Sequence, residues 1–194
     1  MAKLVVSQFM TVDGVVEDPG GSEKFERGGW AFQFERGPEG DKFKLDELMA
    51  SDALLLGRTT YEGFAEAWPS REGEFADKFN EMRKYVVSST LSDPDWNNSQ
   101  VISPDNLAAE VARIKDEHDG DILVNGSVQL VQALTELGLV DEYRLMVFPI
   151  VLGKGKQLFA GTAEPRPLKL TSSQQAGDTL IQTFEPASGL RPKA

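Results

Sequence analysis

The sequence has no cysteine and only one histidine, His118. A chain without cysteine forms neither a disulfide framework nor a thiolate metal site, and it has no thiol nucleophile. One histidine cannot build a cluster of imidazole ligands, and we expect His118 to be solvated because it stands in a polar run. Any redox chemistry must therefore use a bound cofactor.

Long apolar segments are also missing. No run of about 18 apolar residues occurs, so nothing in the sequence predicts a membrane-spanning helix. The first residues, Met1–Val6, do not show the charged, apolar and small-residue pattern of a signal peptide. We therefore expect a cytoplasmic protein.

Positive charge is scarce. The chain has 20 Lys and Arg against 31 Asp and Glu, which gives a net charge of −11. Nucleic-acid binding depends on basic patches that neutralise phosphates, and anionic membranes repel an acidic surface. We therefore expect neither nucleic acid nor a membrane as partner, and the charge alone specifies no other partner.

The length and composition fit one globular domain. At 194 residues the chain barely leaves room for two domains. Its hydrophobic fraction of 40% and charged fraction of 26% are near the average for globular proteins. We expect one domain over residues 1–186 and a disordered tail over residues 187–194.

Strand and helix patterns alternate over the first two thirds of the chain. Short apolar runs followed by turn residues predict strands, and apolar residues at helical spacing predict helices. We expect strands at 3–10, 53–56, 85–88, 101–102 and 121–124, and helices at 41–50, from 59 or 60, at 74–84, 106–118 and 128–137. This alternation is typical of a mostly parallel sheet with helices on both faces.

The last third breaks the alternation. A strand at 142–148 is followed by a hairpin, 168–173 with 179–184, around Gly177, and no helix lies between its strands to make a crossover. Antiparallel strands should therefore close one edge of the sheet. The predicted fold class is α/β, with three layers, a mostly parallel central sheet and an antiparallel C-terminal edge.

The segment from Glu17 to Gly40 is rich in Gly, Pro and charge, yet it carries Trp30, Phe32 and Phe34 in alternation. A long loop with aromatic side chains is more often a lid or a binding loop than a linker. We expect this loop to face a ligand and to be more mobile without it.

Small and polar residues follow several predicted strands, at the positions where open α/β sheets bind ligands. Gly57 lets the backbone approach a ligand, Arg58 offers donors to a phosphate, and Thr60 is able to cap a helix whose positive end faces the same anion. The bland alternative is a glycine turn, a solvated arginine and an ordinary helix cap.

Three further segments allow two interpretations each. Asn125-Gly126-Ser127 precedes a helix and is either a phosphate site or a simple helix cap. Ser88-Ser89-Thr90 is more simply a polar strand end. Gly153-Lys154-Gly155-Lys156 is similar to an anion loop, although such residues often make only a turn.

The order of these motifs resembles the dihydrofolate-reductase-like fold, and within it the reductase (RibD C-terminal) domain of bacterial riboflavin synthesis and its stand-alone relatives. The resemblance covers about Lys3 to Phe184. The segments that carry it are Thr11-Val12-Asp13-Gly14-Val15-Val16, Leu56-Gly57-Arg58-Thr59-Thr60-Tyr61, Val87-Ser88-Ser89-Thr90, Val124-Asn125-Gly126-Ser127, and Pro149 to Gly155 with Leu158-Phe159. Five motifs in the right order are more specific than any one alone.

This resemblance implies NADPH as the cofactor, lying across the carboxyl ends of the strands. The implied cofactor-binding residues are Val16, Gly57, Arg58, Thr60, Ser88, Ser89, Thr90, Gly126, Ser127 and Val128. Arg58 and the Ser88 to Thr90 turn would lie near the adenosine phosphate, and the two glycine junctions near the pyrophosphate. Trp30 and Phe34 would face the substrate.

The sequence departs from the dihydrofolate reductases at two points. Asn125 replaces the first of their glycines after the fifth strand, which puts a cis peptide bond there in doubt. Their carboxylate on the first helix has no secure match here, although Glu35, Glu39 and Asp41 are nearby. Asp13 is therefore the catalytic candidate, as a substrate-orienting or proton-relaying group; the alternative is a turn aspartate that binds its own backbone.

We therefore expect an NADPH-dependent reductase of a small heterocyclic or carbonyl substrate. The best-known substrate of the family is the 5-amino-6-(5-phosphoribosylamino)uracil of riboflavin synthesis. The His and Cys ligands of a deaminase are missing, which excludes the two-step riboflavin enzyme. The alternatives are a cofactor-binding protein without turnover and a plain structural domain. Because relatives pair through C-terminal strands, we also expect a homodimer.

Overall fold

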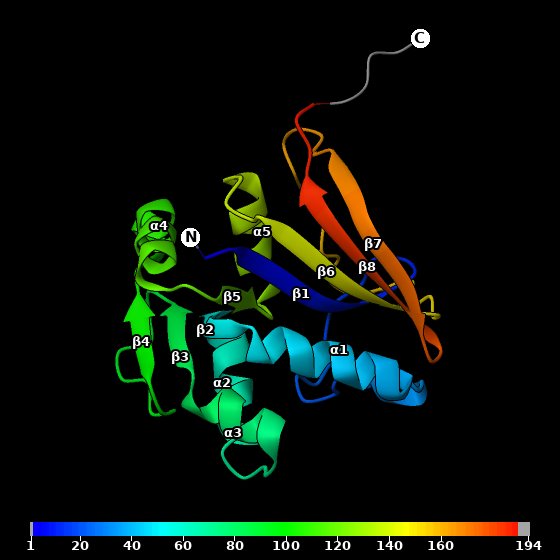
Figure 1. Cartoon of the computed structure of the whole chain (residues 1–194), viewed down its shortest axis with the longest axis horizontal. Helices are drawn as coiled ribbons and strands as arrows, with labels where there is room; N and C mark the ends of the chain where they lie inside the picture. Colours follow the sequence, from blue (N-terminus) through cyan, green and yellow to red (C-terminus); the bar gives the residue numbers. More distant parts are fainter. Residues whose placement is uncertain (1, 190–194) are drawn as a thin grey trace.

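An eight-stranded mixed sheet forms the centre of the molecule (Figure 1). The computed structural model describes residues 2–189, and its strands lie in the order β4-β3-β2-β5-β1-β6-β8-β7. The strands are β1 (Leu4–Thr11), β2 (Ser51–Gly57), β3 (Arg83–Val87), β4 (Ser99–Ile102), β5 (Asp121–Val124), β6 (Glu142–Phe148), β7 (Leu168–Ala176) and β8 (Thr179–Pro186). The helices are α1 (Gly37–Met49), α2 (Arg58–Ala67), α3 (Glu74–Glu81), α4 (Leu107–Glu117) and α5 (Val128–Glu136), with short 3-10 turns at Trp30–Gln33 and Pro104–Asn106.

The direction of the strands changes near the C-terminal edge of the sheet. The five neighbouring pairs from β4 to β6 are parallel. β8 pairs antiparallel with β6 on one side and with β7 on the other. The structure therefore confirms the predicted fold class, including the antiparallel edge.

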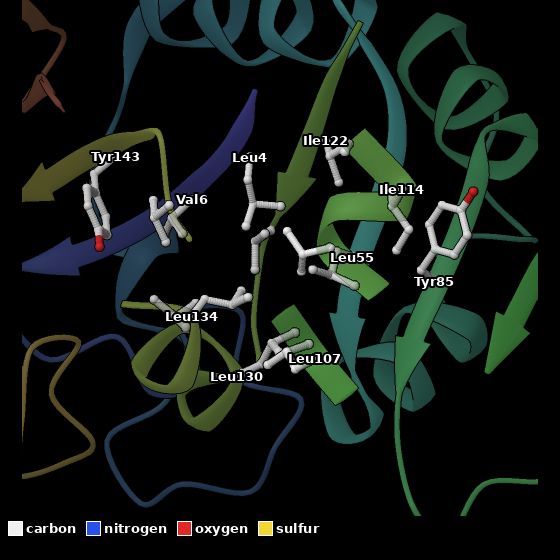
Figure 2. Packing of buried hydrophobic residues seen from close by; sticks show 14 of the residues in the cluster. Leu4, Val6, Leu55, Tyr85, Leu107, Ile114, Ile122, Leu130, Leu134 and Tyr143 are labelled. Atoms are coloured by element: carbon white, nitrogen blue, oxygen red, sulfur yellow. The ribbon is translucent and has the colours of Figure 1, made fainter. Parts of the chain in front are cut away.

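Helices cover both faces of the sheet. α4 and α5 pack on one face, where Leu107, Ile114, Leu130 and Leu134 meet side chains of the strands (Figure 2). α1, α2 and α3 lie on the other face (Figure 1), and their contacts include those of Leu48, Tyr61 and Phe79 with the sheet. The central strands are buried on both sides, because successive side chains of a strand point to opposite faces.

Three features differ from the sequence predictions. α1 begins at Gly37, four residues earlier than expected, because Pro38 is tolerated in a first helical turn where its missing N–H has no partner to lose. β7 extends to Ala176, and its strand signal is weak because residues 169–175 are exposed. His118 is half-buried rather than solvated, with Nε2 lying 3.0 Å from the hydroxyl of Tyr85.

The end of the chain is described only in part. β8 ends at Pro186, and residues 187–189 follow it. The rest of the expected disordered tail, residues 190–194, lies outside the described residues. Between residues 2 and 189, no helix has both the length and the apolar character needed to cross a membrane.

Lys84 on β3 is fully buried, which is unusual for a lysine without a carboxylate partner. Its Nζ donates to the backbone carbonyls of Asn80, Met82 and Asn97 at 2.8, 2.9 and 3.0 Å. The ammonium also lies 4.2 Å from the centre of the Trp96 ring. Burial lowers the pKa of Lys84 to about 8. One side chain therefore holds the end of α3 and the loop before β4 against the sheet.

We expect Lys84→Met to lower the free energy of unfolding, because three carbonyls lose their donor, by about 1–3 kcal/mol. The deficit should grow with pH. Burial depresses the folded-state pKa below 10.5, so above pH 8 the unfolded chain binds more protons and the wild type gains stability, by on the order of 1 kcal/mol per pH unit. Urea unfolding of both proteins at about pH 7.5 and about pH 9.5 measures this. A deficit independent of pH would contradict the role of burial.

Candidate active site

The carboxyl ends of the parallel strands meet at one edge of the sheet. β2 ends at Gly57 and β3 at Val87, and these two residues are paired in register. β5 ends at Val124 beside β2, and β1 is its neighbour on the other side. Because neighbouring strands lie about 4.8 Å apart, the segments singled out from the sequence follow adjacent strands at the same edge.

Two of these segments touch each other. The N–H of Gly57 donates to the carbonyl of Gly126 at 3.0 Å. A Cβ on Gly57 would lie 2.3 Å from Ser127 Oγ and 3.0 Å from its backbone N, and a Cβ on Gly126 would lie 2.6 Å from Thr60 Oγ1. A side chain at Gly57 would crowd Ser127, and the φ of +135° at Gly126 is a conformation that favours glycine. The Gly126–Ser127 peptide bond is cis, which the sequence had left in doubt.

The contact brings two helix N-termini together. α2 starts at Arg58 after Gly57, and α5 starts at Val128 after Ser127. The N-cap residues are Gly57 in α2 and Ser127 in α5, and neither makes a side-chain capping hydrogen bond, so the expected capping by Thr60 is wrong. Thr60 lies inside the first turn of α2, and Ser127 faces Gly57 instead. The two helix ends, whose backbone donors carry no side-chain caps, meet at a junction where the helix dipoles favour an anion, and we refer to this junction as the cradle.

Arg58 and the segment after β3 lie at the side of this cradle. The guanidinium of Arg58 pairs with Glu62 one turn further along α2, at 2.9 Å, and both side chains are about half exposed. Such an exposed pair contributes little stability. Ser88 Oγ accepts from the N–H groups of Thr90 and Leu91. This turn leaves Ser89 and Thr90 exposed at the surface.

β1 and β5 diverge beside the cradle, and sequence reasoning did not predict the contact of Asn125 there. β1 pairs with β5 only over Leu4–Val6 and then continues beside β6 alone. The side chain of Asn125 bridges the divergence, because its Nδ2 donates to the carbonyl of Ser7 at 3.2 Å. Asn125 Oδ1 is buried without a hydrogen-bond partner, and so is Nε2 of Gln8 on β1. Asn125, which stands where dihydrofolate reductases have a glycine, therefore links β1 to the end of β5 through its side-chain amide.

Asp13 has the contacts of a structural residue. Its carboxylate accepts from Thr11 Oγ1 at 2.6 Å, from the N–H of Gly153 at 2.7 Å and from the N–H of Leu152 at 3.2 Å. The Thr11 hydroxyl and these N–H groups hold the pKa of Asp13 below its usual value. The carboxylate therefore stays ionised at neutral pH, which favours the turn-aspartate alternative over a proton donor.

The lysines after Gly153 are paired with the long loop rather than free for an anion. Lys154 Nζ lies 2.6 Å from Glu26, and Lys156 Nζ lies 2.8 Å from Glu17. Beside them, the N–H of Val16 donates to the carbonyl of Lys156. Val16 is itself buried and held in place, next to the turn at Asp13.

An open pocket of about 500 Å³ lies on the α1 face of β1 and β6. Its lining consists of Phe9, Ala31, Phe32, Phe34, Glu35, Arg36, Gly37, Pro38, Asp41 and Phe148. Phe34 therefore lines a pocket, in keeping with its expected contact with substrate. Trp30 is not among the lining residues: it is fully buried, its ring centre lies 5.3 Å from that of Phe148, and its Nε1 donates to the Glu17 carbonyl. Trp30 therefore anchors the loop before α1 and packs behind Phe148, which lines the pocket.

A buried charge cluster below the pocket also escaped sequence reasoning. Glu47 on α1 is 5% exposed, and its Oε1 accepts from Ser7 Oγ at 2.8 Å and from Lys44 Nζ at 2.5 Å. Lys44 Nζ lies 5.6 Å from the ring centre of Phe9, at the floor of the pocket. The one sequence signal was a lysine and a glutamate three residues apart on the sheet-facing side of a predicted helix.

Comparison with known proteins gives matches over nearly the whole chain. Residues 2–181 match the family model of the RibD C-terminal domain. The chain is 28% identical over 185 residues to the uncharacterised protein YyaP of Bacillus subtilis (strain 168), with 93% of this chain and 92% of that protein covered.

Solved structures show the same fold at low sequence identity. A protein of Shewanella sp. PV-4, provisionally described as a riboflavin biosynthesis protein, has a TM-score of 0.76 at 18% identity, with 97% of this chain and all of that chain covered. Dihydrofolate reductase of Enterococcus faecalis in complex with NADP(H) and RAB-propyl has a TM-score of 0.53 at 13% identity, with 96% and 97% covered.

We expect Gly57→Ala to open the contact between the two junctions, because its Cβ would lie 2.3 Å from Ser127 Oγ, 2.9 Å from Ser127 Cβ and 3.0 Å from Ser127 N. The free energy of unfolding should fall by about 1–3 kcal/mol. Gly63→Ala on the same helix is the matched control, since nothing lies within 4 Å of its added Cβ, and it should stabilise by about 0.4–1 kcal/mol. Denaturant unfolding measures both. Adding Ser127→Gly to Gly57→Ala should restore part of the loss; equal stability of the two alanine variants would refute the contact.

Proposed function

Because the chain belongs to the RibD C-terminal domain family, we propose that it is an NADPH-dependent reductase of a small heterocyclic or carbonyl substrate. The observation that carries this proposal is the contact between Gly57 and Gly126-Ser127. It joins two uncapped helix N-termini and leaves no room for a Cβ, as expected where a backbone must approach a pyrophosphate. The donors present therefore fit the group.

We propose that the cofactor lies across the carboxyl edge of the sheet. Gly57, Thr60, Gly126, Ser127 and Val128 would hold its pyrophosphate. The adenosine phosphate would lie over the adjacent ends of β2 and β3. There it would contact Arg58, Ser88, Ser89 and Thr90. The nicotinamide end would reach the divergence of β1 and β5, where Val16 is held by its bond to Lys156. Bound there, NADPH supplies a hydride, and the protein orients the two rings and excludes water.

The substrate would occupy the pocket beside Phe9 and Phe148. β1 is the strand next to β5, so this pocket begins one strand away from the divergence. We propose that Phe34 contacts the substrate. Trp30 would support the pocket indirectly, by packing against Phe148. The reference candidate is 5-amino-6-(5-phosphoribosylamino)uracil, as the resemblance implies. For Asp13 we propose a positioning role, since its contacts fix the turn between β1 and Val16.

One observation favours an alternative, a cofactor-binding protein without turnover. Asp13 is kept ionised by its donors, and the acids that line the pocket, Glu35 and Asp41, are exposed. Two measurements distinguish the reductase from the binding protein. NADPH is first titrated into the protein to measure binding, and its absorbance is then monitored with a panel of heterocyclic and carbonyl compounds to detect oxidation. Binding with oxidation supports the reductase, binding without oxidation favours the alternative, and no binding of NADPH removes both.

We expect Arg58→Ala to weaken NADPH more than NADH, because only NADPH carries the additional phosphate. The loss should be about 1.5 kcal/mol, the lower end for a charge-assisted hydrogen bond, since the arginine is half exposed. Calorimetric titration of both cofactors measures the ratio of the affinities. Glu62→Gln frees the guanidinium and is the control; it should leave NADPH binding equal or tighter. Equal weakening of both cofactors by Arg58→Ala would move this residue to the shared pyrophosphate.

We propose a homodimer that pairs through the C-terminal strands. β7 is an edge strand exposed over residues 169–175, and Leu170 is 50% exposed. Edge strands of this kind offer unpaired backbone groups to a second chain. Sedimentation should give twice the chain mass of 21.3 kDa at micromolar concentration, and Leu170→Lys should shift the protein toward the monomer. A monomer at all concentrations would contradict the proposal.

A further inference from the structure

We infer that the pocket of Phe9, Phe34 and Phe148 takes a flat, uncharged aromatic ring system and discriminates against a phosphorylated one. This inference rests on the proposed function, because it assigns the substrate class of the proposed substrate pocket. If it holds, the substrate differs from the reference candidate, 5-amino-6-(5-phosphoribosylamino)uracil, in having no phosphate.

The apolar part of the pocket is a cluster of rings packed edge to face. Phe9 and Phe34 lie 5.2 and 6.2 Å from Phe148, with ring planes inclined by 61° and 62°. Trp30 completes the cluster from behind. Phe32, at the mouth, is 81% exposed. These rings offer faces and edges on which a planar ring can stack, and covering Phe32 removes apolar surface from water.

The charges that line the pocket do not favour an anion. Glu35, Arg36 and Asp41 line it, which gives one positive and two negative charges. Among the described residues, Arg36 is the one cation in the lining, and its Nε lies 2.5 Å from Asp41 Oδ1 in an exposed pair. A phosphate would have to displace Asp41 from Arg36 and then lie close to two carboxylates. Like charges close to one another repel.

The cations behind the lining are neutralised as well. Lys44, near the ring of Phe9, is bound to Glu47 at 2.5 Å and to Ser7. Arg144 lies deeper and contacts Glu142 at 2.6 Å and Asp121 at 2.9 Å. Within residues 2–189, each cation that adjoins the pocket therefore has its own carboxylate.

The acidic rim is also fixed in position. The tip of the β7–β8 hairpin lies against the start of α1 (Figure 1), where the N–H of Glu35 donates to Asp178 Oδ2 at 2.9 Å and the N–H of Asp178 donates to the Glu35 carbonyl at 2.7 Å. A Cβ on Gly177 would lie 2.3 Å from that carbonyl. The hairpin therefore fixes the backbone at Glu35 and adds the carboxylate of Asp178 beside it.

Two matched pairs of probes test the inference: riboflavin with flavin mononucleotide, and uridine with uridine 5′-monophosphate. The members of each pair differ by one phosphate. Binding is measured by flavin fluorescence and by calorimetry on protein saturated with NADPH, so that the phosphate cradle is filled. We expect the uncharged member of at least one pair to bind about tenfold more tightly than its phosphate ester. Equal or tighter binding of both esters would overturn the inference, and so would no binding of either uncharged ring.

Variants assign the effect to the pocket. Phe34→Ala should abolish binding of the uncharged probes. Asp41→Asn should narrow the preference by several fold, because it removes a carboxylate and frees Arg36. Asp46→Asn removes the same charge from α1, where Asp46 pairs only with Lys42 at the surface, and should leave the preference unchanged. A preference that Asp41→Asn does not alter, or that Asp46→Asn alters equally, would overturn the inference.

The outcome is separable from that of the proposed function. NADPH is titrated alone into each protein before the probes are added. Absence of NADPH binding counts against the reductase proposal. The probe pairs still test the pocket in that case, because probe binding that is lost in Phe34→Ala takes place in the pocket.

Discussion

The close approach of Gly57 to Gly126 and Ser127 sets the geometry of the carboxyl edge of the sheet. It fixes the distance between the ends of β2 and β5, and it directs α2 and α5 away from one point. Two positive helix ends held side by side repel each other. Packing of the two helices on opposite faces of the sheet holds them there, and an anion bound at the junction would relieve the repulsion. The requirement for glycine and the proposed anion site therefore both follow from this close approach.

Much of the fold follows from periodicity alone. Apolar runs such as Leu54 to Leu56 mark strands buried on both faces, and the lack of a helix between 168 and 184 indicates the antiparallel edge. β7 was underestimated because an exposed edge strand needs no apolar alternation. α1 was placed too late because glycine and proline at its start resemble loop residues.

The site was less accessible to sequence reasoning, because its contacts join residues far apart in the chain. The glycine junctions were found, since glycine before a helix is a local signal. The burial of Trp30 and the donors to Asp13 depend on Phe148 and Gly153, more than 100 residues away. The pairing of Lys44 with Glu47 under the sheet is local in sequence, but its burial depends on Ser7 of another strand.

The hairpin that fixes the backbone at Glu35 has a consequence for synthesis of the chain. The rim at Glu35 to Gly37 leaves the ribosome about 140 residues before Gly177 and Asp178, which hold it. A nascent chain therefore lacks this contact until the hairpin has been translated, and β6 lacks its outer partner for the same time. Translation, and not only folding, sets when this contact first forms.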